Sequence, residues 1–238
     1  MGDDDDVMVA ARAWAGSPMA LATVVSTWGS APRPRGSHML VHADGRFAGS
    51  VSGGCVEGDI LDTAAQVIAG APAVVRTYGV ADDSAWEVGL PCGGEIAVLV
   101  QPVSPAGFDP ALFDRIETER AAGRSLSVAT DLATGISREA GAAADDGGFV
   151  NRYDPPRRLL IVGAVQIAQR LAALAGTLGI AVVVIDPRGR FLTTERFPGV
   201  ALDDRWPDEA VAAYAPGPAT AVVTLSHDTK IDDPALIA

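Results

Sequence analysis

Residues 49–58 read GSVSGGCVEG, and this stretch does most to decide how the first half of the chain folds. Glycine has no Cβ, so Gly53 and Gly54 allow a sharp turn and a close approach to a bound group. Cys55 follows at once and opens an amphipathic segment, residues 56–68, that we expect to be helical. A thiol at a helix N-terminus meets the positive end of the helix dipole, which favours its thiolate form. The stretch indicates a site for an anion, a metal or sulfur transfer, or else a structural cysteine in a glycine-rich turn.

A second cysteine, Cys92, lies in a similar run, GLPCGGE, at residues 89–95. Pro91 cannot donate a backbone hydrogen bond and therefore marks a strand edge or a turn. Gly93 and Gly94 permit another tight loop before an apolar run. For Cys92 two roles stay open: a functional partner of the first thiol, or a small buried hydrophobic residue.

A third segment, GSAPRPRG at residues 29–36, places two arginines on stiff, turn-prone chain. A guanidinium matches phosphate oxygens in a planar fork, so Arg33 and Arg35 are candidate anion contacts. The alternative is an ordinary solvated loop.

The bulk composition excludes several classes of protein. The chain has 238 residues, 48% of them hydrophobic, and a formal net charge of -12. This charge argues against general nucleic-acid binding and against an anionic membrane surface as partner. Two cysteines are too few for a disulfide scaffold or a four-ligand zinc site. Because no targeting segment is recognisable, we expect a cytoplasmic protein.

The pattern predicts an α/β fold with two domains. Residues 1–105 form the first, residues 106–157 a connector of helix, hairpin and linker, and residues 158–238 a Rossmann-like parallel βαβ domain that is incomplete at its C-terminus. We expect helices at 7–16, 56–69, 110–122 and 167–178, and strands at 19–26, 39–42, 46–52, 74–78, 96–100, 125–130, 136–139, 159–162, 181–185 and 219–225.

The last domain carries a weak dinucleotide-binding signal. Gly163 follows a short apolar strand, and Asp186 lies about 20 residues further on, where a Rossmann unit places its ribose-binding carboxylate. Val165 stands where the fingerprint has its second glycine, and a β-branched side chain there crowds a pyrophosphate. The sequence therefore leaves an NAD(P)-dependent oxidoreductase as the alternative function and makes NAD(P) binding doubtful.

Together these segments resemble the XdhC/CoxI family of accessory proteins for xanthine dehydrogenase and related molybdenum hydroxylases. The matching residues are 29, 30, 32, 33, 36, 39–41, 49–57, 92–94, 163, 186–188, 196–198, 227, 228, 230, 232 and 234–236. The resemblance implies a chaperone without turnover of its own. Such a protein binds the molybdenum cofactor (molybdopterin, with or without a nucleotide), assists its sulfuration by a cysteine desulfurase, and inserts it into a xanthine dehydrogenase or CO dehydrogenase-type apoenzyme.

The resemblance also implies roles for individual residues. Cys55 would be a molybdenum ligand or the holder of transferred sulfur, with Cys92 as its partner. Glu57 would be either a ligand contact or an acid placed in the first helical turn. The remaining expected cofactor contacts are Arg33, Ser52, Gly53, Gly54, Gly93, Gly94, Gly163 and Asp186.

Other features leave alternatives open. An incomplete sheet has an edge that can pair with a second copy, so a homodimer is expected. Cys55 and Cys92 could instead form a reversible disulfide in a redox switch. His38 and His42 are expected to be surface residues or satisfied core residues. His227 and Asp228 lie where open α/β sheets bind ligands, but they could equally cap a helix.

Overall fold

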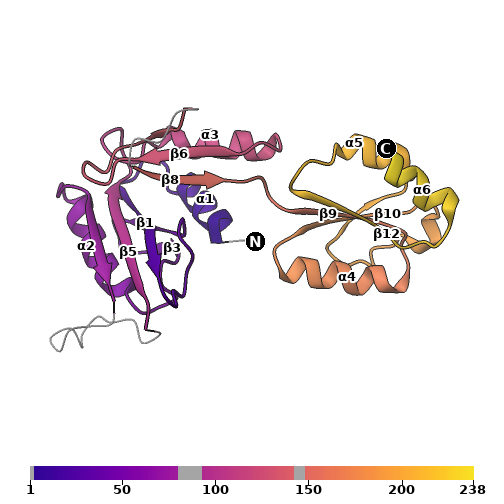
Figure 1. Ribbon diagram of the computed structural model, residues 1–238, viewed down its shortest axis with the longest axis horizontal. Helices are drawn as coiled ribbons and strands as arrows, with labels where there is room; N and C mark the ends of the chain where they lie inside the picture. The colour runs from indigo at the N-terminus through magenta and orange to yellow at the C-terminus, as the bar shows by residue number, and fades with distance from the viewer. Residues whose placement is uncertain (1–2, 80–92, 142–147) are drawn as a thin grey trace. The chain divides into compact units, whose positions relative to one another are not determined.

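The computed structural model describes residues 3–79, 93–141 and 148–238 of the chain (Figure 1). It divides into two compact units between Tyr153 and Asp154. None of the helices formed by the described residues has the length and apolar composition needed to cross a bilayer.

The centre of the first unit is a five-stranded antiparallel sheet in the order β3-β2-β1-β5-β4. Strand β1 has side chains that alternate between two hydrophobic clusters: Ala20, Ala22 and Val24 face one, whereas Met19 and Leu21 face the other. This alternation follows from the two-residue period of a strand, and it shows that both faces of the sheet are covered. The five strands are β1 (Met19–Trp28), β2 (His38–His42), β3 (Phe47–Gly49), β4 (Val74–Tyr78) and β5 (Glu95–Pro102).

Helix α2 (Glu57–Ile68) covers one face of this sheet (Figure 1). Its buried residues Ile60, Ala64 and Val67 recur with helical spacing and pack against β1 and β5. The other face is covered by α1 (Asp3–Ala13), α3 (Ala111–Ala121) and a small antiparallel sheet in the order β7-β6-β8. Its strands are β6 (Leu126–Thr130), β7 (Ser137–Glu139) and β8 (Phe149–Tyr153).

The second unit is a parallel sheet with helices on both faces, in the strand order β11-β10-β9-β12. Helix α4 lies on one face, and α5 and α6 lie on the other (Figure 1). The elements in chain order are β9 (Arg158–Val162), α4 (Gln166–Thr177), β10 (Ala181–Ile185), a short 3₁₀ turn η1 (Gly189–Phe191), β11 (Ala201–Asp203), α5 (Pro207–Tyr214), β12 (Thr220–Thr224) and α6 (Thr229–Ile237). This is the architecture of a Rossmann-like fold, so the predicted α/β class is confirmed.

The predicted strands and helices are confirmed apart from their ends, whereas β8, β11, α5, α6 and the short turn η1 are not among them. Strand β8 follows a segment expected to be a linker, of which residues 142–147 lie outside the described residues. β8 pairs with β6, which is more distant in sequence, and Asn151 and Arg152 interrupt its strand-favouring residues. β11 is three residues long, and α5 has a weak amphipathic pattern. Tertiary pairing, which sequence pattern does not report, decides such short elements.

A buried polar network joins the two sheets of the first unit. The His38 ring is buried, with Nδ1 2.9 Å from Thr23 Oγ1 and Nε2 2.8 Å from the Tyr153 hydroxyl. The amide nitrogen of Asn151 lies 3.1 Å from the same Nε2. A neutral imidazole uses one nitrogen as donor and the other as acceptor, so both ring nitrogens are satisfied. His38 is therefore a satisfied core residue, as predicted.

Acidification should destabilise the first unit through His38. Burial lowers the pKa of this imidazole to about 4, against 6.5 for an ordinary histidine. Between these two values only the unfolded chain takes up the proton, so the free energy of unfolding falls as the pH drops. The loss should reach about 3 kcal/mol at pH 4, because one pKa unit corresponds to about 1.4 kcal/mol.

Urea unfolding between about pH 7 and about pH 4 measures this loss. His38→Gln should remove the histidine part of the pH dependence, whereas His42→Gln, on the same strand, should keep it. Equal pH dependence in wild type and His38→Gln would contradict the assignment.

Candidate functional site

The predicted glycine segments meet at one end of the five-stranded sheet. The register pairs Trp28 at the end of β1 with Glu95 at the start of β5, and Tyr78 at the end of β4 with Ile96. Asp59, in the first turn of α2, receives the Tyr78 hydroxyl hydrogen bond and an ion pair from Arg76 of 3.2 Å. The N-terminus of α2 and the loop that leads into it therefore lie at this same end of the sheet.

Two of the glycine segments touch directly. A Cβ placed on Gly94 would clash with the carbonyl oxygen of Ser30 and would lie 2.9 Å from that of Trp28. Only glycine allows this approach, so Gly94 holds the 28–30 segment against the start of β5. Arg33 is half-buried in the continuation of this segment. Arg35 donates to the Val25 carbonyl oxygen at 3.1 Å and lies over the Phe149 ring.

The loop before α2 is folded around one carboxylate, that of Glu57. Its Oε1 accepts hydrogen bonds from Ser50 Oγ at 2.7 Å, from the amide of Ser52 at 2.9 Å and from that of Val51 at 3.3 Å. Its Oε2 accepts from the amide of Gly54 at 2.8 Å and from Ser52 Oγ. Five donors thus converge on the carboxylate of a residue that is only 9% exposed.

The two serines satisfy the remaining amides of the loop. Ser50 Oγ accepts from the amide of Gly53 at 2.8 Å. Ser52 Oγ accepts from the amides of Cys55 and Val56, both at 3.0 Å. Every backbone N–H from residue 51 to residue 56 therefore donates to Glu57, Ser50 or Ser52. The amides that we expected to face a phosphate are used within the loop.

The surroundings of Glu57 favour its ionised form. Burial opposes its ionisation, but hydrogen bonds from Ser52, Ser50 and the backbone outweigh that penalty and lower its pKa to about 2. The carboxylate is therefore the anion of this loop, supplied by the chain itself.

The thiol of Cys55 lies outside this network and is exposed. Gly53 and Gly54 have φ angles of +75° and +119°, and a Cβ on either would meet no atom within 4 Å. Gly93 likewise faces open space. The structure therefore leaves room around these three glycines. Cys92 lies outside the described residues.

Within residues 3–79, 93–141 and 148–238, no group of three or more His, Cys, Asp and Glu side chains is arranged to hold a metal ion.

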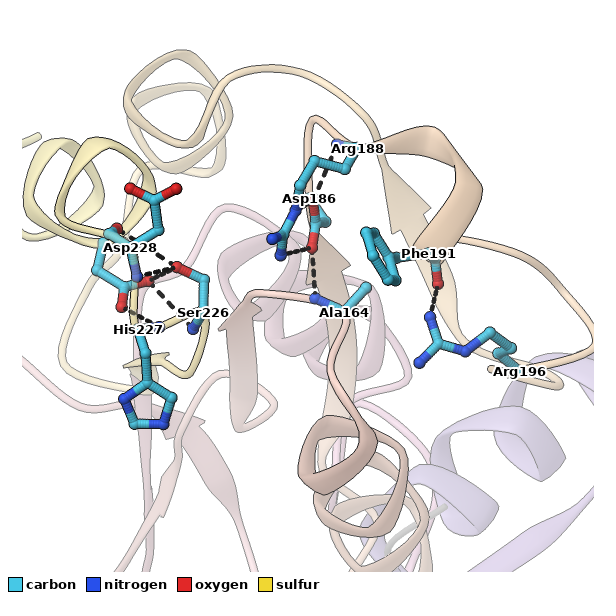
Figure 2. A network of polar contacts seen from close by, with 9 residues as sticks. Ala164, Asp186, Arg188, Phe191, Arg196, Ser226, His227 and Asp228 are labelled. Carbon is cyan, nitrogen blue, oxygen red and sulfur yellow. Dashed lines mark hydrogen bonds and ion pairs between the residues drawn. The ribbon is translucent and has the colours of Figure 1, made fainter.

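In the second unit, Asp186 is the centre of a closed network (Figure 2). It is fully buried, and its Oδ2 accepts from the Ala164 amide at 2.7 Å. Arg188 donates to Oδ1 from its backbone amide and from Nε, and to Oδ2 from Nη2, each at 2.9 Å. Burial opposes ionisation, but the bonds from Arg188 and Ala164 lower the pKa of Asp186. This carboxylate, expected to bind a ribose, is engaged by protein donors on both oxygens.

The turn after β12 lies beside the glycine turn after β9. A Cβ on Gly163 would be 2.7 Å from the Ser226 amide nitrogen, so glycine is required there. Asp232 accepts from Ser226 Oγ at 2.6 Å and from the His227 amide at 2.9 Å. Asp228 accepts from the Lys230 amide and caps α6, which confirms the capping alternative for this residue.

His227 itself adopts a left-handed conformation, with φ of +58°, and is exposed.

Sequence reasoning named Glu57 but missed its part in the loop. It also missed Ser50 and the pair of Asp59 and Arg76. The available signal was an acid placed three residues after a run rich in glycine and serine. Because a side chain that turns back toward its own loop leaves no periodic pattern, the sequence could not distinguish it from an acid in the first helical turn.

Comparison with known proteins adds an independent line of argument. The model of the XdhC and CoxI family matches residues 13–79, and the model of the XdhC Rossmann domain matches residues 159–238. The "Molybdenum cofactor insertion chaperone PaoD" of Escherichia coli (strain K12) is 31% identical over 165 residues, which cover 69% of this chain and 51% of that protein. The chain thus spans about half the length of this relative.

Two further relatives cover more of the chain. A protein of Bacillus subtilis (strain 168), named as a probable subunit of xanthine dehydrogenase, is 24% identical over 242 residues, or 89% of this chain and 73% of that protein. A crystal structure of a xanthine dehydrogenase from Bacillus halodurans superposes on 100% of this chain and 78% of its own, with a TM-score of 0.79 and 24% identity. At this identity the superposition establishes the fold.

Gly94→Ala should destabilise the first unit by about 1–3 kcal/mol, because the new methyl group meets backbone atoms that cannot rotate away. Gly58→Ala is the matched control: this glycine lies within α2, where a Cβ meets no atom within 4 Å. It should stabilise the protein by up to about 1 kcal/mol. Chemical unfolding of both variants tests the pair, and an unchanged Gly94→Ala protein would disprove the close packing.

Asp186→Ala should lower the free energy of unfolding of the second unit by about 2 kcal/mol or more. It leaves the buried Ala164 amide and the Arg188 guanidinium without their acceptor. Asp204→Ala, which removes an exposed carboxylate of the same unit, should have little effect. Thermal unfolding of the two variants measures the difference, and equal stability of both would show that the hydrogen bonds of Asp186 are not needed for folding.

Proposed function

The chain belongs to the XdhC and CoxI family, and from this premise we propose that it binds the molybdenum cofactor and delivers it to a molybdenum hydroxylase apoenzyme. The E. coli relative is named as an insertion chaperone for this cofactor. The residues matched by the family model include the loop of residues 50–56 that carries Cys55. The protein acts in this proposal by holding and handing over its cargo, without turnover of its own.

The observation that carries the proposal is the exposed thiol of Cys55 on a loop whose backbone is fixed. A soft sulfur ligand suits a transition metal bound through sulfur, and an exposed thiolate suits sulfur transfer. Around it, the open space at Gly53, Gly54 and Gly93 allows a flat ligand to approach the backbone. Cys55 is thus either the metal ligand or the sulfur carrier, and Cys92 is its candidate partner.

The loop amides fit a phosphate poorly while Glu57 is in place, because they already donate within the loop. We therefore assign the pterin phosphate to other donors. Arg33, at the same end of the sheet, and the Gly93-Gly94 backbone are the candidates. Ser52, expected to contact the cofactor, supports the loop instead in this proposal.

Sulfuration would start at Cys55. The Cys55 thiolate attacks the outer sulfur of a persulfide on a cysteine desulfurase, a new S–S bond forms, and the desulfurase thiolate leaves. The sulfur then resides on Cys55 as a persulfide, next to the place where the cofactor binds. The proposed partners are therefore a cysteine desulfurase and the xanthine dehydrogenase or CO dehydrogenase-type apoenzyme. We further propose that the chain acts in the cytoplasm and pairs with a second copy of itself as a homodimer.

The alternative, an NAD(P)-dependent oxidoreductase, receives less support. It needs Asp186 for a ribose and the turn at Gly163 for a pyrophosphate. Asp186 already accepts from Ala164 and Arg188, and Val165 occupies the second glycine position. Fluorescence titration with NADH tests this alternative, and saturable tight binding would revive it.

Cys55→Ala should abolish retention of the cofactor. Wild type and variant are purified from cells that make the cofactor, and bound molybdenum and pterin are measured per protein chain. We expect at least about a tenfold loss, since a metal–sulfur or persulfide contact has no replacement in alanine. Cys55→Ser, which keeps size and polarity but not the soft sulfur, separates ligation from packing. Normal loading of both variants would refute the proposal.

A further inference from the structure

We propose that Glu57 is the positioning residue of this site: its carboxylate occupies the place of a bound anion inside the 50–56 loop and fixes the backbone that carries Cys55. The inference rests on the proposed function for its consequence, which is cofactor retention. The loop geometry itself can be tested without any cofactor.

The first step is the number and direction of the donors. Three amides, those of Val51, Ser52 and Gly54, and two serine hydroxyls donate to the two carboxylate oxygens. Successive amides that converge on one point form a concave anion-binding arrangement. An isolated loop of this shape would attract an external anion, and here the chain provides one.

The second step is the connection to Cys55. Ser52 donates to Glu57 and accepts from the amides of Cys55 and Val56. The position of the cysteine backbone therefore depends on Ser52, and the orientation of Ser52 depends on the carboxylate. Removal of the carboxylate would free Ser52 and, with it, the backbone of Cys55 and Val56.

The third step is the role of the glycines. Gly53 and Gly54 adopt left-handed φ angles that allow the chain to wrap around the carboxylate. Because glycine has no Cβ, these two residues have much conformational freedom in the unfolded or released loop. A fixed anchor is needed to hold this flexible segment in one shape, and Glu57 is the charged group at its centre.

The experiment compares hydrogen–deuterium exchange in wild type and Glu57→Ala, both as the full chain without cofactor. In wild type, the amides in the 50–57 peptide should exchange slowly. In the variant they should exchange at least about tenfold faster, because three of them lose their acceptor. Glu57→Ala removes one methylene and one carboxylate, which together have the size of acetate. Added acetate should therefore restore slow exchange with saturation, whereas chloride at equal ionic strength should not.

Two variants serve as controls. Glu57→Gln keeps the shape but turns an NH₂ group toward amide donors, so its exchange should be fast, and acetate should not restore it because the space is filled. Asp62→Ala removes an exposed carboxylate from the same helix and should exchange as wild type does. Wild-type exchange in Glu57→Gln would show that the charge is not needed and would overturn the proposal.

Cofactor retention separates this inference from the proposed function. Glu57→Ala should lose bound molybdenum at least about tenfold, and acetate should restore it, whereas Cys55→Ala should stay empty with acetate. If wild-type protein never binds molybdenum, the proposed function is wrong, but the hydrogen–deuterium exchange result for Glu57 is unaffected. Fast exchange in Glu57→Ala that acetate leaves unchanged, or full molybdenum retention in that variant, would overturn the role of Glu57.

Discussion

The candidate site of the first unit depends on one interaction, the acceptance of five hydrogen bonds by the buried carboxylate of Glu57. A buried charge is costly unless it is fully hydrogen-bonded, and a glycine-rich loop is costly to order. Each cost is offset by the other partner: the loop solvates the charge, and the charge orders the loop. This mutual stabilisation holds the loop in the shape that leaves the thiol of Cys55 exposed.

The sequence predicted the parts of this fold that are determined locally. β1 and β10 are rich in β-branched residues, and α2 and α4 have helical spacing with glycines shortly after their ends, so periodicity found them. The order of strands in the sheets and the existence of β8 depend on pairing between distant segments. No window of sequence contains both members of such a pair, so the strand order could not be predicted.

The candidate site was predicted as a set of motifs but not as an arrangement. The glycines, the exposed cysteine and the arginine segment were recognised by residue type. Their meeting at one end of the sheet follows from the pairing of Trp28 with Glu95 and from the contact of Gly94 with Ser30. What residue type could not reveal is which acceptor each amide uses. Glu57 and an incoming phosphate compete for the same donors, and sequence spacing does not decide that competition.

The two units share one arrangement: in each, backbone amides of a glycine turn donate to a carboxylate of the chain itself. In each, a glycine turn presents amide donors that could bind a phosphate, and an acid of the chain takes them. Glu57 accepts from Gly54 in the first unit, and Asp186 accepts from Ala164 in the second. Arg188 then neutralises Asp186, whereas the donors to Glu57 among the described residues are N–H and O–H dipoles. Because the acid of each turn engages these amides, a ligand at either turn would have to be recognised by other groups, such as side chains that remain exposed. In the first unit the thiol of Cys55 is such an exposed side chain, and this is the physical reason why our proposal places the chemistry there and not at the Rossmann turn.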